Sequence, residues 1–171
     1  MLVPHPSVVL GTSLGFTRAT YDVFDEAECT VEQVAEQGIG CLQDLSGRPL
    51  DNSPELTTYA FIQFEHLIPL PWETPGWLGP VMGTLRAEHS YSSSLYLQQD
   101  LDPNLTQGAY NIVNLRGGIR NEDNRWDVTL WARNLLNEQY NLVGFDTPII
   151  SGYAAVNGPP RTFGVTMTVK F

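Results

Sequence analysis

The sequence of 171 residues predicts an all-β protein, an antiparallel up-and-down meander of about six long strands. Two observations favour strands over helices. Glycine (15) and proline (12) are more abundant than a bundle of long helices tolerates. Apolar residues also alternate with polar ones in six separate segments, which is the pattern of a sheet whose two faces meet different surroundings.

The six segments cover residues 7–20, 56–67, 83–98, 109–120, 125–136 and 161–171. The last is the clearest, because apolar side chains occupy every second position and threonines fill most positions between them. In the fifth, Val128 and Leu130 alternate with Asp127 and Thr129. The apolar face of the C-terminal segments is expected to include Leu115, Val128, Leu130, Val165, Met167 and Val169.

The connections between these segments alternate in length. About 35 residues follow the first segment, roughly a dozen follow the second and another dozen or so the third, only residues 121–124 follow the fourth, and about 24 follow the fifth. One end of the sheet therefore carries long loops, as in outer-membrane barrels. The alternation alone leaves open a soluble antiparallel β-sandwich, a binding module whose apolar face turns inward. The loop asymmetry favours the C-terminal portion of a transmembrane β-barrel.

Composition excludes other classes. Nine basic residues against nineteen acidic ones give a net charge of −10, which argues against a nucleic-acid partner because phosphate binding needs a basic face. The aromatic content, 11%, is too high for a disordered chain. No apolar run is long enough for a transmembrane helix. Residues 1–6 lack the features of a signal peptide.

Three C-terminal stretches resemble the end of a TonB-dependent outer-membrane receptor. They are 110–119 (YNIVNLRGGI), 126–140 (WDVTLWARNLLNEQY) and 158–171 (GPPRTFGVTMTVKF). In that family an Asn-Leu-Phe-(Asp/Asn)-x-x-Tyr segment closes the penultimate strand, and Pro-Arg-Thr-(Phe/Tyr)-Gly begins the last. Leu136 stands where the family often has Phe. Residues 44–54 are similar to a loop before an inbound strand, so the resemblance covers roughly 7–171.

The resemblance implies that residues 1–171 are the last six strands of a receptor barrel of about 22 strands in the outer membrane of a Gram-negative bacterium. The plug and the earlier strands would be absent. Such a receptor takes up a scarce ligand, which is typically a ferric siderophore and in other members a cobalamin or an oligosaccharide. Because barrels begin at about eight strands, we expect part of a larger receptor, from a split gene or a truncated reading frame.

The partners that the resemblance implies are outer-membrane lipid, the rest of the barrel and its plug, the barrel-assembly machinery and a small-molecule ligand. The TonB energy-coupling system would act through the missing plug. Phe171 matches the final aromatic residue by which these barrels are recognised for membrane insertion.

Cys29 and Cys41 are the only cysteines and lie in the first long loop. In an oxidising envelope we expect a disulfide between them, with two free thiols or a metal site as alternatives. The sequence from Thr30 to Gln33 is typical of a capping box and predicts a helical turn or two. The same loop, 22–55, is strongly acidic, and we interpret it as a solvated surface without an ordered calcium motif.

The connection 137–160 mixes apolar residues with glycine and proline, so it is expected to extend the flanking strands and to fold over the barrel mouth. Tyr140, Phe145 and Tyr153 are the candidate ligand-contacting aromatics, and the alternative is that they pack the loop on itself.

On the polar face we expect a cross-strand ladder of charges lining the lumen, formed by Glu65, Arg86, Glu88 and Arg116. The histidines fall in different segments, and no nucleophile–base pair or metal motif stands out. We therefore predict no enzymatic activity, no metal and no cofactor.

Overall fold

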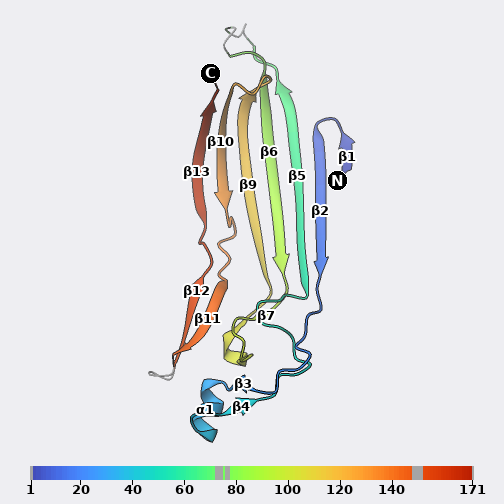
Figure 1. The fold of residues 1–171 in the computed structure, drawn as a ribbon. Helices are drawn as coiled ribbons and strands as arrows, with labels where there is room; N and C mark the ends of the chain where they lie inside the picture. Colours follow the sequence, from blue (N-terminus) through green and yellow to red (C-terminus); the bar gives the residue numbers. More distant parts are fainter. Residues whose placement is uncertain (1, 72–74, 76–77, 148–151, 171) are drawn as a thin grey trace.

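The structure is a computed structural model that describes residues 2–71, 75, 78–147 and 152–170. It is all-β and antiparallel, as predicted, and is built on one seven-stranded sheet of order β1-β2-β5-β6-β9-β10-β13 (Figure 1). Six strands are long and match the predicted segments: β2 (Val8–Phe16), β5 (Leu56–Ile68), β6 (Val81–Ser92), β9 (Tyr110–Asn121), β10 (Trp126–Arg133) and β13 (Thr162–Val169). The short β1 (Leu2–His5) was not expected and pairs with β2 as a hairpin.

The register places the apolar residues of neighbouring strands in rows. Along one row Leu85 lies opposite Phe64 and Gly117, and Leu130 lies opposite Gly117 and Val165. In the next row Val128 lies opposite Ile119 and Met167. Since side chains alternate across a strand, this register puts the predicted apolar residues on one face and the threonines and charged residues on the other.

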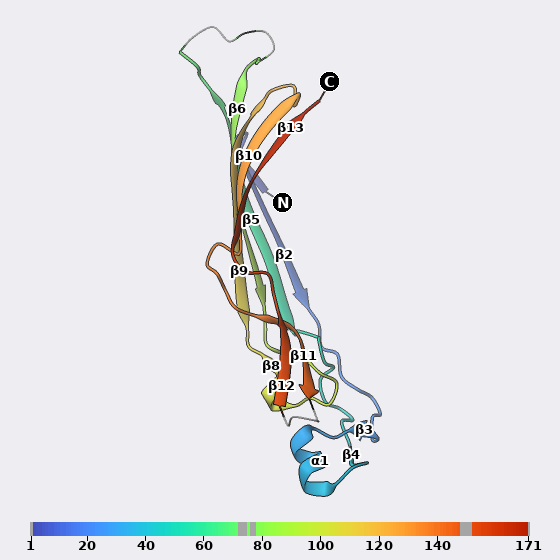
Figure 2. The same ribbon diagram turned by 90° about the vertical axis from the view of Figure 1, so that its left-hand side faces the viewer.

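The apolar face is largely open to its surroundings in the described residues, although Val81 and Ala132 on this face are buried. Leu130 is 61% exposed, Val165 65% and Met167 69%. Figure 2 shows the reason, since the sheet seen from its side is a single gently curved layer with no second sheet stacked on it. The buried apolar core lies elsewhere, mainly at the loop end: Ala27, Leu45, Leu97, Leu101 and Leu105.

The long connections all leave the same end of the sheet (Figure 1). The first carries β3 (Ala27–Glu28), α1 (Val31–Gln37) and β4 (Leu42–Gln43). The second carries β7 (Leu95–Tyr96), the 3-10 helix η1 (Pro103–Leu105) and β8 (Thr106–Gln107), and the third carries β11 (Asn141–Thr147) and β12 (Gly152–Asn157). Among the described residues, no helix has the length and apolar character needed to cross a membrane.

Three predicted strands extend too far. The first segment, 7–20, ends as β2 at Phe16. The third segment, 83–98, ends as β6 at Ser92, where its pairing with β9 stops. Leu95 and Tyr96 form a separate short strand and pair with Gln107 and Thr106. The fifth, 125–136, ends at Arg133, because Asn134 adopts the left-handed backbone conformation (φ 48°), which a strand cannot continue.

The predicted charge ladder forms with one change of partner. Glu88 accepts hydrogen bonds from Arg86 Nε at 2.7 Å and Arg116 Nη2 at 3.2 Å, and so bridges two arginines that lie directly opposite each other. Glu65 does not join them. It pairs with Arg120 of β9 at 3.0 Å, reaching across β6 at the level of the small residue Thr84, which lies opposite Glu65 on one side and Gly118 on the other.

Arg86 is the most connected side chain of the polar face. Its other guanidinium nitrogens donate to Gln63 Oε1 at 2.8 Å and to the Tyr59 hydroxyl at 3.0 Å, and its charge lies 4.0 Å from the centre of the Phe61 ring. These contacts explain why Glu65 needs another partner, since the donors of Arg86 already have acceptors. Each exposed ion pair stabilises by at most about 1 kcal/mol, so the value of the network lies mainly in fixing side-chain positions.

Trp131 lies on the polar face and fits only because its cross-strand neighbour is glycine. A Cβ at Gly164 would lie 2.1 Å from Trp131 Cζ2, and the indole nitrogen donates to Thr166 Oγ1 at 3.1 Å. Gly164→Ala should therefore displace the ring and lower the free energy of unfolding by about 1–3 kcal/mol, the usual cost of overpacking. Denaturant titration in detergent measures the change.

Gly108→Ala is the matched control, because no atom lies within 4 Å of a Cβ built there. Equal free energies of unfolding for the two alanine variants would contradict the close packing of Trp131 against Gly164.

Candidate functional site

The candidate site lies at the loop end, where all three long connections meet. In Figure 2 the β11–β12 hairpin runs next to β8, and α1 lies below it. Side-chain contacts confirm this proximity: Asn104 Nδ2 donates to Glu32 Oε1 at 3.1 Å and to the Tyr153 hydroxyl oxygen at 2.9 Å. We call this region, residues 20–51, 96–107 and 141–157 without the undescribed 148–151, the loop cluster.

The first connection is held in shape by a disulfide and a capped helix. Cys29 and Cys41 are joined, with their Cα atoms 5.7 Å apart. Thr30 and Gln33 form a capping box at the start of α1, in which Thr30 N donates to Gln33 Oε1 at 2.9 Å. This box satisfies backbone groups that the first turn of a helix leaves free, so seven residues suffice for a stable helical segment.

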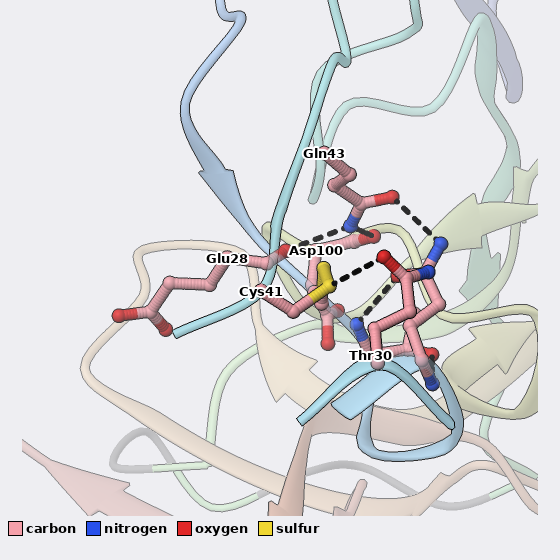
Figure 3. The surroundings of a disulfide bond; sticks show 8 residues. Glu28, Thr30, Cys41, Gln43 and Asp100 are labelled. Atoms are coloured by element: carbon pink, nitrogen blue, oxygen red, sulfur yellow. Dashed lines mark hydrogen bonds between the residues drawn. A yellow bond between two sulfur atoms is a disulfide. The ribbon is translucent and has the colours of Figure 1, made fainter. Parts of the chain in front are cut away.

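Gln43 links the first long connection to the second. Its side-chain nitrogen donates to the backbone oxygen of Glu28 at 2.7 Å and to that of Asp100 at 2.9 Å (Figure 3). The disulfide-bonded segment is thereby fastened to residues more than fifty positions later in the chain. The small apolar core of Ala27, Leu45 and Leu101 lies in the same region.

A cavity of about 610 Å³ opens beside the disulfide. Val31, Val34 and Ala35 of α1 supply its apolar wall, and the polar side chains of Gln98 and Asp146 lie at its edge. Cavities of this size, mostly apolar with a few polar groups, suit small-molecule ligands.

Three carboxylates converge next to the cavity. Asp100, Asp102 and Asp146 each place one oxygen within 4.8 Å of the others, although Asp146 comes from a different connection. Burial is the main reason that the pKa of Asp100 is raised to about 7, and the nearby charges of Asp146 and Asp102 also raise it. Burial raises the pKa of Asp146 as well, and the charges of Asp102 and Glu32 add to this effect.

The structure does not bring the three predicted ligand-contacting aromatics together. Tyr140 stacks on Tyr110, with ring centroids 4.6 Å apart. Tyr153 faces the loop cluster and hydrogen-bonds to Glu32, which is the largest cause of a Tyr153 pKa raised to about 12. Phe145 is adjacent in β11 to Asp146, which pairs with Tyr153, so Phe145 points to the opposite side of the hairpin.

The Asn-x-x-Asn segment after β10 shapes the way into the hairpin. Asn134 and Asn137 both have left-handed backbones, and Asn134 is buried. The side chain of Asn134 accepts from Glu138 N at 2.8 Å and donates to Pro159 O at 3.1 Å, while Asn137 Oδ1 accepts from Arg161 N at 3.1 Å. These bonds hold the outgoing and returning chains together at the edge of the sheet.

Sequence reasoning missed both the cavity and the carboxylate cluster. The sequence could have indicated the apolar wall of the cavity, because the spacing of Val31, Val34 and Ala35 puts them on one side of a helix. The pair Asp100 and Asp102 had only their closeness in sequence as a signal, because Leu101 between them adopts the left-handed backbone conformation (φ 54°) and not an extended one. Asp146 had none, because only the folding of the hairpin against the second connection brings it there. The predicted insertion signal, Phe171, lies outside the described residues.

The raised pKa of Asp100 predicts that the local stability of the loop cluster depends on pH. The measurement is made with EDTA, so that no divalent cation binds to the carboxylates. Between its ordinary value of 3.8 and about 7, folded Asp100 holds a proton that the unfolded loop releases. Its contribution to local stability is therefore greatest below about pH 4 and is lost as the pH rises through 7. Amides of residues 97–107 should be more protected from hydrogen exchange at pH 5 than at pH 8, after correction for intrinsic rates.

Asp100→Asn should reduce this difference, whereas Glu36→Gln, on the exposed side of α1, should keep it. The raised pKa of Asp146 accounts for the part that remains in Asp100→Asn. Protection that is equal at the two pH values in the unchanged chain would contradict the assignment. Asp102, Asp146 and Glu32 are the other acidic groups near Asp100 that the measurement must consider.

Comparison of the chain with protein-family models, with curated proteins and with solved structures finds no match.

Proposed function

We propose that this chain is the C-terminal part of the barrel of a TonB-dependent receptor in the outer membrane of a Gram-negative bacterium. The observation that carries the proposal is a single-layer sheet with exposed apolar side chains on one face and a hydrogen-bonded polar network on the other. Lipid would cover the first face. Water or a plug would meet the second.

Strand length supports this setting. The six long strands contain 8 to 13 residues. A tilted strand needs about 9–11 residues to cross the hydrocarbon core of a bilayer. The alternation that divides the two faces continues through all six strands, which a surface with lipid on one side requires.

The two edges of the sheet are unpaired, which indicates that further strands are needed. In the described part of the chain, β1 and β13 are the outer strands and do not pair with each other. Their unpaired N–H and C=O groups would be too costly in lipid. The missing strands of the receptor would pair with them, after insertion by the barrel-assembly machinery. The plug, which couples to the TonB system, would then fill the lumen.

The loop cluster would lie outside the cell, since the long loops of such barrels are extracellular. We propose that the receptor takes up a scarce small molecule, with a ferric siderophore as the leading candidate. We also propose that the cavity beside the disulfide contributes to its binding. Tyr153, which faces the cluster, stays a candidate contact, together with Tyr140 and Phe145. Without plug and remaining strands, the chain alone would not transport.

The faces provide the test. In the whole receptor, Val165→Arg should destabilise the barrel by about 2–4 kcal/mol if the residue lies near the bilayer midplane, because the charge would enter hydrocarbon. Thr166→Arg, its neighbour on the polar face, is the matched control and should have a small effect. Insertion is measured as the fraction of receptor in outer membranes with heat-modifiable gel mobility.

Equal tolerance of arginine at Val165 and Thr166 would count against a membrane-facing sheet. A soluble sandwich would instead leave the wild-type chain in the aqueous fraction without detergent. The DNA upstream of Met1 offers an independent check, since the proposal requires a plug and further strands to be encoded there.

A further inference from the structure

We propose that Asp100, Asp102 and Asp146 bind a calcium ion that fastens the connections of the loop cluster to one another. The first observation is geometric. One oxygen from each carboxylate lies within 4.8 Å of the others. Calcium–oxygen bonds are about 2.3–2.6 Å long, so two oxygens on opposite sides of one ion are about 4.6–5.2 Å apart. The three oxygens therefore fit a single coordination sphere.

The second observation is that buried carboxylate oxygens lack a hydrogen-bond donor. Asp102 is only 1% exposed, and its Oδ2 has no partner among the described residues, while its Oδ1 accepts from Asn104 N at 2.7 Å. Asp146 Oδ1 is buried and unpartnered in the same way, whereas Asp146 Oδ2 accepts from Gln98 Nε2 at 3.4 Å. A buried charged oxygen without a partner is costly, and a cation would remove that cost.

In the part of the chain that the structure describes, no basic side chain supplies this neutralising charge. The four ion pairs of the described residues involve Arg86, Arg116, Arg120 and Arg125, which belong to the sheet and its short turn. Glu32, which hydrogen-bonds to Asn104 and Tyr153 nearby, adds negative charge to the surroundings. The cluster thus gathers carboxylates from distant parts of the chain with no counter-charge of its own.

The chemistry of the donors selects the ion. Carboxylate oxygens are hard ligands, and neither cysteine sulfur nor histidine is part of the group, which disfavours zinc and copper. Calcium accepts irregular oxygen sites completed by water, whereas magnesium demands nearly ideal octahedral geometry.

The ion would tie connections that are otherwise joined by few bonds. Asp100 and Asp102 flank Leu101 of the small apolar core, and the Asp100 backbone oxygen already accepts from Gln43 of the disulfide-bonded segment. Asp146 belongs to β11 and also borders the cavity. Calcium would therefore fix the hairpin against the first and second connections and set the shape of the cavity edge.

Calorimetric titration with calcium chloride tests the proposal, on the full chain in detergent micelles at pH 8 after removal of divalent cations. We expect one site with a Kd of about 10⁻⁴–10⁻³ M, in the range of extracellular calcium modules. Calcium should also slow hydrogen exchange in residues 97–107 and 141–147. Asp102→Asn and Asp146→Asn should each weaken binding about tenfold or more, and the control Glu36→Gln should change it less than twofold.

Absence of saturable binding by the unchanged chain up to about 10 mM calcium would overturn the proposal, whatever the variants do. Binding that both aspartate variants retain would overturn it too, since the ion would then lie on other acidic residues of the first connection. If Asp102→Asn fails to fold, Asp146→Asn and the exchange measurement decide. The site needs only the loop cluster, so calcium binding by the full chain, combined with equal tolerance of arginine at Val165 and Thr166 in the whole receptor, would refute the proposed function and leave this inference standing.

Discussion

Every long strand of this protein carries apolar side chains on one face, and the need to cover that face is the constraint on which the rest of the structure depends. Burial of apolar surface is the main force that favours folding. In the described residues the sheet keeps this surface exposed, so its strands are held mainly by backbone hydrogen bonds and cross-strand contacts. A sheet of this kind requires a partner surface, and the proposed membrane setting would supply hydrocarbon as that partner.

The loop cluster meets the same requirement in the opposite way. Ala27, Leu45 and Leu101 form a buried core there, and a disulfide and the bonds of Gln43 connect segments that are far apart in sequence. Its interior is small, so polar groups are buried together with apolar ones, including the carboxylates of Asp100 and Asp102. The molecule therefore combines a wide sheet without an internal core and a compact region with one.

The sheet was predictable from the sequence because its signal is local. Alternation in a segment such as 161–171 fixes both the strand and the face of each side chain, and the strand pairs follow from the order of the segments. The ends of the strands were less predictable. β10 ends because Asn134 adopts a left-handed backbone conformation, and the apolar–polar alternation around it gives no sign of this. The loop cluster could not be predicted, because Asp146 meets Asp100 only through packing between two connections. Similarly, Glu65 pairs with Arg120 because Arg86 already donates its hydrogen bonds to Glu88, Gln63 and Tyr59.

The asparagine-lined exit from β10 has a consequence for how the protein can vary. Asn134 binds Pro159, and Asn137 binds Arg161, so the two chains are clamped where they leave the sheet. The pairing of β10 with β13 begins immediately beyond this clamp, at Arg133 and Thr162. Residues inserted at the tip of the β11–β12 hairpin would therefore not shift the register of the sheet, in which a slip by one position would exchange its two faces. A longer or shorter hairpin would thus change the surface chemistry of the loop cluster and leave the sheet unchanged.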